Sequence, residues 1–205
     1  MNFFWVGAGV SAAVCRIFGR MQVIGRENIP KTGGALLCGN HVSYIDPSAL
    51  AGRAGRVVHF MAKSELFKIP VLGFLVKGVG AFPVKRGTAD RGALKRAIEY
   101  LQNGEVVAMF PEGQRSLTGE LLKAEAGAGM IALHAKVPVI PVALVDTEKL
   151  LPPHKMFFRF TRIKVVFGLP IPLDDLHERG GREATDEVGK RIMEAIGRLL
   201  EEHRK

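Results

Sequence analysis

A histidine and an aspartate lie close together in residues 40–47, which read NHVSYIDP. A neutral imidazole can accept a proton near pH 7, and a neighbouring carboxylate can fix its tautomer and stabilise the imidazolium that forms. His41 and Asp46 therefore fit a general base and the group that orients it. The same residues also fit two metal ligands, the partner of a nucleophile, or ordinary loop polarity in which Asp46 caps a helix starting at Pro47.

The rest of the sequence gives little support to a metal site or to a nucleophile served by His41. Catalytic zinc usually takes three protein ligands, and no other histidine is spaced with His41 as a metal-binding pair. A nucleophile would have to be Cys38, which lies in an apolar run, or Ser43, which lacks the G-x-S-x-G setting of a nucleophile elbow. We therefore expect both residues to be structural, and we expect no metal site.

Two later stretches also place charged residues where a predicted strand ends. The first reads GAFPVKRG and ends in Lys85, Arg86 and a glycine, while the second reads FPEGQRS and carries Glu112 and Arg115. Arginine can grip a phosphate through two N–H groups, and lysine adds positive charge. Either stretch alone would fit a solvated strand end. Together with His41, they predict a proton acceptor beside a phosphate-binding surface.

The elements that must position these residues follow from the apolar pattern. Helical spacing predicts helices at residues 91–103, 123–136 and 186–202, the last with Asp186 as its N-cap. Their alternation with strands predicts a single α/β domain with a mixed, largely parallel sheet flanked by helices. In such sheets functional residues gather on loops at strand ends. Short apolar runs predict the strands, at residues 22–24, 35–38, 57–61, 81–84, 106–110, 139–144 and 163–167.

Composition narrows the choice of partner and compartment. A chain of 205 residues suits one domain with a sizeable core, and its formal net charge of +9 favours an anionic partner. The sequence has neither zinc-finger spacing nor an RNP-like aromatic motif, so we expect a membrane surface or a phosphorylated substrate rather than nucleic acid. The two cysteines, Cys15 and Cys38, indicate neither a disulfide framework nor a zinc site. A reducing, cytosol-facing location fits them.

The first 20 residues have a character of their own. Residues 2–15 are apolar and aromatic, and Arg16 and Arg20 follow them. A bilayer-spanning helix needs about 20 apolar residues, and a signal peptide carries its positive charge before the apolar region rather than after it. From the residues alone, the segment fits either a buried first helix or a helix lying in the membrane interface. We divide the chain into a membrane-associating helix at 1–20 and an α/β domain at 21–205.

Four ordered blocks resemble the glycerolipid acyltransferase family. NHVSYIDP is similar to the family's N-H-x-x-x-x-D block, and GAFPVKR is similar to its second block, with Gly80, Phe82 and Arg86 in place. FPEGQRS is similar to the third block, F-P-E-G-T-R-S, with Gln114 in place of the usual small residue. Residues 137–142 resemble the fourth, an apolar strand bearing prolines. Four blocks in the right order are far more specific than any one of them.

The resemblance implies an acyltransferase of the α/β class. It would move a fatty acyl group from the thioester of acyl-CoA or acyl carrier protein to the free hydroxyl of 1-acyl-glycerol-3-phosphate, giving phosphatidic acid. These thioesters are co-substrates, and no other cofactor is expected. The alternatives are transfer to glycerol-3-phosphate or another lysophospholipid, a lipid or thioester hydrolase, and a basic membrane-surface adaptor without catalytic activity.

The resemblance also implies roles for individual residues. His41 would be the general base, oriented by Asp46, and no covalent enzyme intermediate would form. Substrate binding would fall to the second and third blocks, at Gly80, Phe82, Lys85, Arg86, Glu112, Gly113 and Arg115. Within this set the two arginines would hold the acceptor phosphate, and Glu112 would shape the site or bond the glycerol.

The acceptor implied by the resemblance also bears on location. Such a lysophospholipid lies in the membrane surface, where an apolar aromatic helix and a positive net charge would meet it. We therefore expect a peripheral or monotopic enzyme on the cytoplasmic face of the cell membrane, in contact with anionic lipid.

Overall fold

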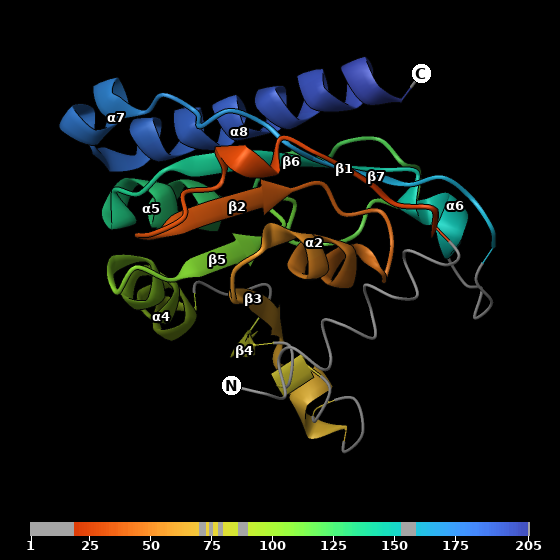
Figure 1. The fold of residues 1–205 in the computed structure, drawn as a ribbon. Coiled ribbons are helices and arrows are strands. Elements are labelled where there is room, and N and C mark those ends of the chain that lie inside the picture. Colours follow the sequence, from red (N-terminus) through yellow and green to blue (C-terminus); the bar gives the residue numbers. More distant parts are fainter. Residues whose placement is uncertain are drawn as a thin grey trace.

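The computed structural model describes residues 19–69, 73, 76–77, 80–85, 90–152 and 159–204. Its centre is a seven-stranded sheet in the order β1-β7-β6-β2-β5-β3-β4 (Figure 1). Every predicted strand is present, and its ends lie within two residues of the predicted ones. The strands are β1 (Gln22–Ile24), β2 (Ala35–Gly39), β3 (Val58–Lys63), β4 (Ala81–Val84), β5 (Val106–Met109), β6 (Val139–Val145) and β7 (Lys164–Phe167).

The strand directions put five carboxyl ends at one edge of the sheet. β6, β2, β5, β3 and β4 are joined by parallel pairings, while β7 runs antiparallel to β6 and parallel to β1. The loops that follow β2, β5, β3 and β4 therefore leave from the same edge. This arrangement confirms the predicted fold class, a single α/β domain with a mixed, mostly parallel sheet flanked by helices.

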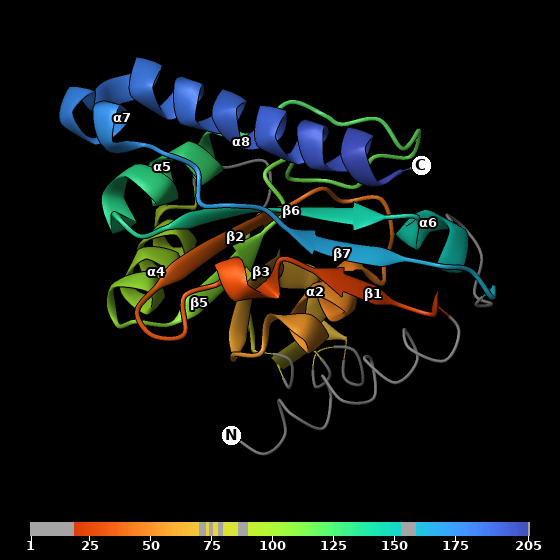
Figure 2. The ribbon, with the colours of Figure 1, turned by 45° about the horizontal axis from the view of Figure 1, so that its top comes forward.

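Both faces of the sheet are buried, which explains why its strands read as continuous apolar runs. In β2, Leu36 and Cys38 face one core cluster, whereas Ala35 and Leu37 face the other. Helices on one face of the sheet cover the first cluster, and α2 covers the second from the other face (Figure 2). These helices are α4 (Arg91–Gln102), α5 (Ala126–Ala135) and α8 (Gly181–His203) on one face, and α2 (Asp46–Ala54) on the other.

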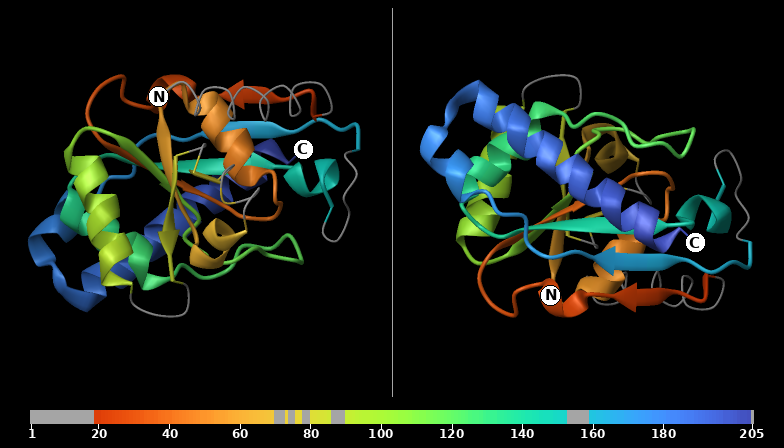
Figure 3. Two further views of the ribbon diagram at one scale, coloured as in Figure 1. Left: turned by 90° about the horizontal axis from the view of Figure 1, so that it is seen from below. Right: turned by 90° about the horizontal axis from the view of Figure 1, so that it is seen from above.

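The long C-terminal helix begins earlier than predicted. Asp186 is not its N-cap, because α8 already starts at Gly181 and runs over β6 on the face opposite α2 (Figure 3). Gly180 and Gly181 both have positive φ, which only glycine adopts readily, so the turn before α8 falls on this pair. Further short helices were not predicted: α6 (Thr147–Leu150), α7 (Asp174–Arg179), and the 3-10 turns η1 (Arg26–Asn28) and η2 (Ser64–Lys68).

The membrane-associating helix predicted at residues 1–20 falls almost wholly outside the described residues, which begin at residue 19. The predicted boundary between residues 20 and 21 therefore stays a prediction. Across the part of the chain that the structure does describe, no helix combines the length and the apolar character needed to cross a membrane.

Candidate active site

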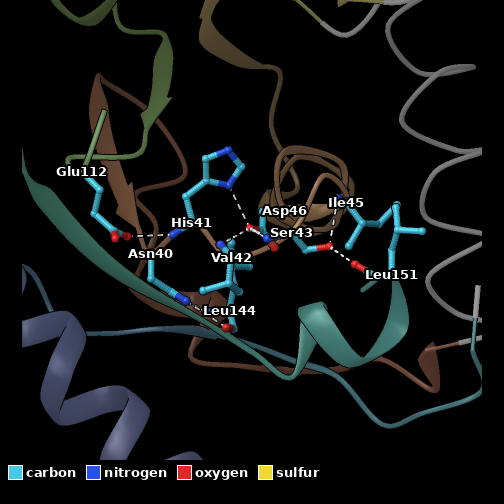
Figure 4. A network of polar contacts seen from close by, with 9 residues as sticks. All are labelled: Asn40, His41, Val42, Ser43, Ile45, Asp46, Glu112, Leu144 and Leu151. Atoms are coloured by element: carbon cyan, nitrogen blue, oxygen red, sulfur yellow. Dashed lines mark hydrogen bonds and ion pairs between the residues drawn. The ribbon is translucent and has the colours of Figure 1, made fainter. Parts of the chain in front are cut away.

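The loop between β2 and α2 folds around a single carboxylate oxygen. Oδ2 of Asp46 accepts hydrogen bonds from the backbone N–H groups of Val42 at 2.8 Å and Ser43 at 2.7 Å. It also lies 2.9 Å from Nδ1 of His41 (Figure 4). Asp46 is fully buried and is itself the first residue of α2, after an N-cap at Ile45. The helix thus begins one residue earlier than the capping interpretation assumed, and the bonds of this carboxylate go back to the loop.

The contact with Asp46 determines which nitrogen of His41 is left to react. An ionised carboxylate only accepts hydrogen bonds, so Nδ1 must carry the proton and Nε2 of the neutral ring keeps its lone pair. His41 is 7% exposed as a residue, and its ring stacks on Phe110 with centroids 4.1 Å apart and planes 14° apart. Figure 4 shows it turned away from the rest of the network. None of the described residues hydrogen-bonds Nε2, so this nitrogen can accept a proton from a molecule in front of it.

The backbone of His41 is fixed from both sides by the turn that follows β5. Its N–H donates to Oε1 of Glu112 at 2.9 Å, and its carbonyl accepts from the N–H of Ser116 at 2.8 Å. β5 is the neighbour of β2 in the sheet, so the loops after these two strands meet. The placement of the imidazole therefore depends on a second loop as well as on its own.

Glu112 is the residue through which that turn holds the loop. It is 2% exposed, and its other oxygen, Oε2, accepts from the N–H of Leu122 at 3.0 Å. Burial raises the pKa of Glu112, while the N–H groups of Leu122 and His41 lower it in part. Both carboxylate oxygens are occupied by backbone donors. Of the two roles predicted for Glu112, the contacts favour shaping the site over bonding a substrate.

Asn40 ties the end of β2 to β6 on the other side. Its Oδ1 accepts from the N–H of Leu144 at 2.7 Å, and its Nδ2 donates to the carbonyl of Leu144 at 3.1 Å. Neither this role nor the ring stacking of Phe110 was predicted from the sequence. One feature of the sequence could have indicated the role of Asn40. It is a polar amide directly after an apolar strand, and its donor and acceptor can pair with the carbonyl and N–H groups of a neighbouring strand.

Arg115 lies against the histidine loop. Gly113 has a φ of +68° and donates its N–H to the carbonyl of Phe110 at 3.0 Å, which closes a tight turn. The chain then brings the guanidinium carbon of Arg115 to 3.5 Å from the centre of the Tyr44 ring. A cation is thus held beside the loop that carries His41 and Asp46.

The second block reaches the same edge of the sheet, but farther along it. β5 and β3 lie between β2 and β4, so three strand spacings, about 14 Å, separate β4 from β2. Lys85 follows β4 and is exposed, and its N–H donates to Asp90 at 2.9 Å. Arg86, predicted to bind phosphate, lies outside the described residues.

Two other residues of the second block have contacts within the fold. Gly80 has a φ of +76°, and its carbonyl lies 3.3 Å from Nδ1 of His59. Phe82 is buried and packs on the ring of Tyr100 with centroids 5.5 Å apart. The first contact joins the start of β4 to β3, and the second packs β4 on α4. The described residues thus bring His41, Asp46, Glu112, Gly113 and Arg115 together, whereas Gly80 and Phe82 support the strand that leads to Lys85.

The geometry disfavours the covalent interpretations of the site. Cys38 is fully buried in the sheet, and burial raises the pKa of its thiol well above the usual range. Ser43 donates its hydroxyl to the carbonyl of Leu151 at 3.0 Å, on the side away from the imidazole (Figure 4). Within the described ranges there is also no group of three or more His, Cys, Asp or Glu side chains suited to a metal ion.

The fold and the site are those of an α/β protein with a histidine and an aspartate at the carboxyl edge of its sheet, an arrangement that suits many enzymes. Comparison with known proteins shows which family of enzymes this chain resembles. Residues 20–145, more than half of the chain, match the family described as Acyltransferase. The chain belongs to the acyltransferase family, which confirms the resemblance found in its sequence blocks.

Relatives within the family extend the likeness to nearly the whole chain. The 1-acyl-sn-glycerol-3-phosphate acyltransferase of Bacillus subtilis is 29% identical over 197 residues, which are 94% of this chain and 96% of that one. The protein of the same name from Streptococcus pneumoniae is 31% identical over 82% of this chain and 61% of its own. A chloroplastic relative from Arabidopsis thaliana is matched over only 38% of its length.

A solved structure has the same fold. The crystal structure of the 1-acyl-sn-glycerophosphate acyltransferase PlsC from Thermotoga maritima superposes with a TM-score of 0.77 at 28% identity. The likeness covers 99% of this chain and 79% of that one.

Proposed function

We propose that this acyltransferase moves a fatty acyl group from the thioester of acyl-CoA or acyl carrier protein to the free hydroxyl of 1-acyl-glycerol-3-phosphate, giving phosphatidic acid. Membership of the family and the names of the relatives support this choice of reaction. The observation that carries the mechanism is the contact of His41 Nδ1 with Asp46 at 2.9 Å, which leaves Nε2 as the proton acceptor.

The reaction follows from that contact. An alcohol is a weak nucleophile until its proton is removed, and Nε2 of His41 takes this proton at about 2.6–3.2 Å in a productive pose. The alcohol oxygen forms a bond to the thioester carbon, and the carbon–sulfur bond breaks as the tetrahedral intermediate collapses. The thiolate that leaves takes up the proton held on the imidazole. Asp46 keeps the ring in its tautomer and stabilises the imidazolium between the two transfers.

Binding of the acceptor falls to the cations at the same edge. Arg115 lies beside the histidine loop, and two of its N–H groups can hold a phosphate. Lys85, and Arg86 by its place in the sequence, add charge from β4. In this proposal Glu112 fixes the backbone of His41 and makes no bond to the acceptor.

The proposal includes a membrane surface as a partner. The acceptor carries an acyl chain and lies in the bilayer, and the net charge of +9 favours anionic lipid. The apolar residues 2–15 would enter the interface, with Arg16 and Arg20 at the headgroups, on the cytoplasmic face.

A panel of acceptors, given labelled acyl-CoA or labelled acyl carrier protein, tests the reaction by product mass. We expect phosphatidic acid from 1-acyl-glycerol-3-phosphate, and we expect His41→Ala to lower kcat about a hundredfold or more, because a positioned base contributes at least that factor. His134→Ala is the matched control, because His134 is an exposed histidine on α5.

Different results reject different parts of the proposal. Product from glycerol-3-phosphate or another lysophospholipid, but none from 1-acyl-glycerol-3-phosphate, would reject the acceptor. Release of free fatty acid without transfer would indicate a hydrolase. Normal turnover by a folded His41→Ala protein would reject the general base.

A further inference from the structure

An exposed aromatic ring within the histidine loop carries a cation on its face. Tyr44 is 63% exposed, yet Cζ of Arg115 lies only 3.5 Å from the centre of its ring. Core packing does not account for a tyrosine that is mostly in solvent. Tyr44 lies between His41 and Asp46 in the sequence, and Arg115 comes from the turn after β5. The contact therefore joins the histidine loop to the turn that carries Arg115.

The distance fixes how the guanidinium sits. A separation of 3.5 Å is van der Waals contact, and a planar group fits at this distance without overlap when it stacks on the ring. A ring face attracts a cation through its negative quadrupole. The N–H groups of arginine lie in the guanidinium plane and point outward from its rim. Stacking therefore holds the guanidinium in place and leaves its N–H groups able to bind two oxygens of a phosphate.

Arg115 has no competing anchor in the described part of the chain. None of those residues forms a hydrogen bond or an ion pair with its side chain, and the ring of Tyr44 is the contact that holds it. The neighbouring N–H of Ser116 is bonded to the carbonyl of His41, which fixes the backbone on one side. The side chain itself is long and would otherwise sample many rotamers.

The backbone that carries Tyr44 is held by its two neighbours in the histidine loop. The N–H of Ser43, the residue before it, donates to the oxygen of Asp46 that also contacts His41. Ile45, the residue after it, is the N-cap of α2. The backbone of Tyr44 therefore belongs to the same hydrogen-bonded loop as His41, so a cation on its ring is held beside the imidazole's loop.

We infer that Tyr44 is a positioning residue for the acceptor, which acts by holding the guanidinium of Arg115 where the phosphate must bind. With the phosphate anchored there, the hydroxyl of the acceptor comes into line with Nε2 of His41. This inference rests on the proposed function, because it assumes a phosphorylated acceptor. It makes Tyr44 important for the affinity of one substrate and not for that of the acyl donor.

Steady-state kinetics with 1-acyl-glycerol-3-phosphate separate this role from a general structural one. Tyr44→Leu should raise the acceptor KM roughly two- to fivefold, the size expected for a partly exposed cation–π contact, with the donor KM unchanged. Tyr44→Phe keeps the ring and should stay close to wild type. Leu117→Ala is the control, because Leu117 is 64% exposed just beyond the same turn and should leave both KM values unchanged.

Two further arms test whether Tyr44 acts through Arg115. With a 1-acylglycerol acceptor that has no phosphate, Tyr44→Leu should have no effect. In an Arg115→Ala background, adding Tyr44→Leu should not raise the acceptor KM further, because the cation is already absent. If the leucine variant does not fold, Tyr44→Gln provides a second replacement without a ring.

The inference is overturned by an acceptor KM that does not change in folded Tyr44→Leu. It is also overturned if Tyr44→Phe loses as much as Tyr44→Leu, or if the loss persists in the Arg115→Ala background. These outcomes require an active wild-type enzyme, so they differ from failure of the proposed function. A wild type that makes no phosphatidic acid at all would reject that function and this inference with it.

Discussion

One carboxylate oxygen gathers three polar contacts of the histidine loop. Oδ2 of Asp46 receives two backbone N–H groups and the imidazole, whereas Oδ1 is buried and has no hydrogen-bond partner among the described residues. The uneven sharing concentrates negative charge on the side of the ring. Asp46 thereby both shapes the loop and fixes the tautomer of His41.

Replacement of this carboxylate by an amide separates the two roles. Asp46→Asn keeps a similar shape and an oxygen that accepts N–H bonds, but a neutral amide cannot stabilise an imidazolium. We expect kcat for acyl transfer to fall at least about a hundredfold, with a smaller change in the acceptor KM. Steady-state kinetics check this, with circular dichroism to show that the variant folds.

The control is Asp186→Asn, a change of the same kind on a largely exposed side chain of α8. It should leave kcat unaltered. Wild-type kcat in the Asp46→Asn protein would mean that Asp46 only shapes the loop.

At this scale the sequence predicts contacts within one loop better than contacts between loops. His41 and Asp46 are five positions apart, so a short turn is enough to join them. The stacking of Phe110 and the bonds of Asn40 depend on which strands are neighbours, because they link β2 to β5 and β6. Strand order cannot be read from the apolar runs, which look alike in every buried strand.

At the scale of elements, Asp90 joins β4 to α4. One oxygen accepts from the N–H of Lys85 at 2.9 Å, and the other caps α4 by accepting from the N–H of Ala93 at 3.0 Å. These two N–H groups, that of Lys85 first, lower the pKa of Asp90. A single residue therefore holds the end of β4 and the start of the next helix.

Loss of this residue should destabilise the fold in a pH-dependent way. Because the pKa of Asp90 is lower in the folded than in the unfolded chain, its stabilising contribution is present above the unfolded pKa. It disappears as the pH falls through the folded pKa. Asp90→Ala should therefore lower Tm by a few degrees at pH 7, and this difference should shrink below about pH 4.

Thermal melts of both proteins at pH 7, 5 and 3 measure the effect. Glu99→Ala is the control, because Glu99 lies in the same helix and its side chain forms an ion pair with the exposed Lys95. A Tm difference for Asp90→Ala that stays the same at pH 3 and pH 7 would contradict the role of its charge.

The start of α8 shows that local sequence pattern does not determine where a helix begins. An acidic residue is a good N-cap, so the local pattern predicts that α8 starts at Asp186. The helix instead starts where the φ angles of Gly180 and Gly181 allow the chain to turn, and Ala184 then extends its buried face. Tertiary packing decided the boundary, and single-residue preference did not.

At the scale of the whole molecule, α5 and α8 pack with almost no space between their backbones. A methyl group on Gly129 of α5 would overlap the carbonyl oxygen of Thr185 in α8. Because that oxygen belongs to the backbone, the helices would have to separate. We expect Gly129→Ala to lower the free energy of unfolding by about 1–3 kcal/mol, as for overpacked cores.

Gly127→Ala in the same helix is a matched control. The added carbon would lie 3.6 Å from Cδ2 of Leu94, which is ordinary contact. It should be neutral or stabilise by up to about 1 kcal/mol, because alanine favours a helix over glycine. Urea unfolding measures both variants, and equal effects would show that α5 and α8 tolerate a wider spacing.

Two hydrogen bonds from the turn after β5 fix the backbone of His41, and this affects when during folding the site forms. The bond from its N–H to Glu112 joins residues 71 positions apart, and the bonds of Asn40 to Leu144 span 104 positions. Contacts of such long range form only after the intervening chain has closed its loop. The imidazole cannot be aimed by a nascent chain that has reached only α2, or by one whose β5 is still unpaired. In the proposed mechanism, His41 therefore becomes a positioned base only after β2, β5 and β6 have come together.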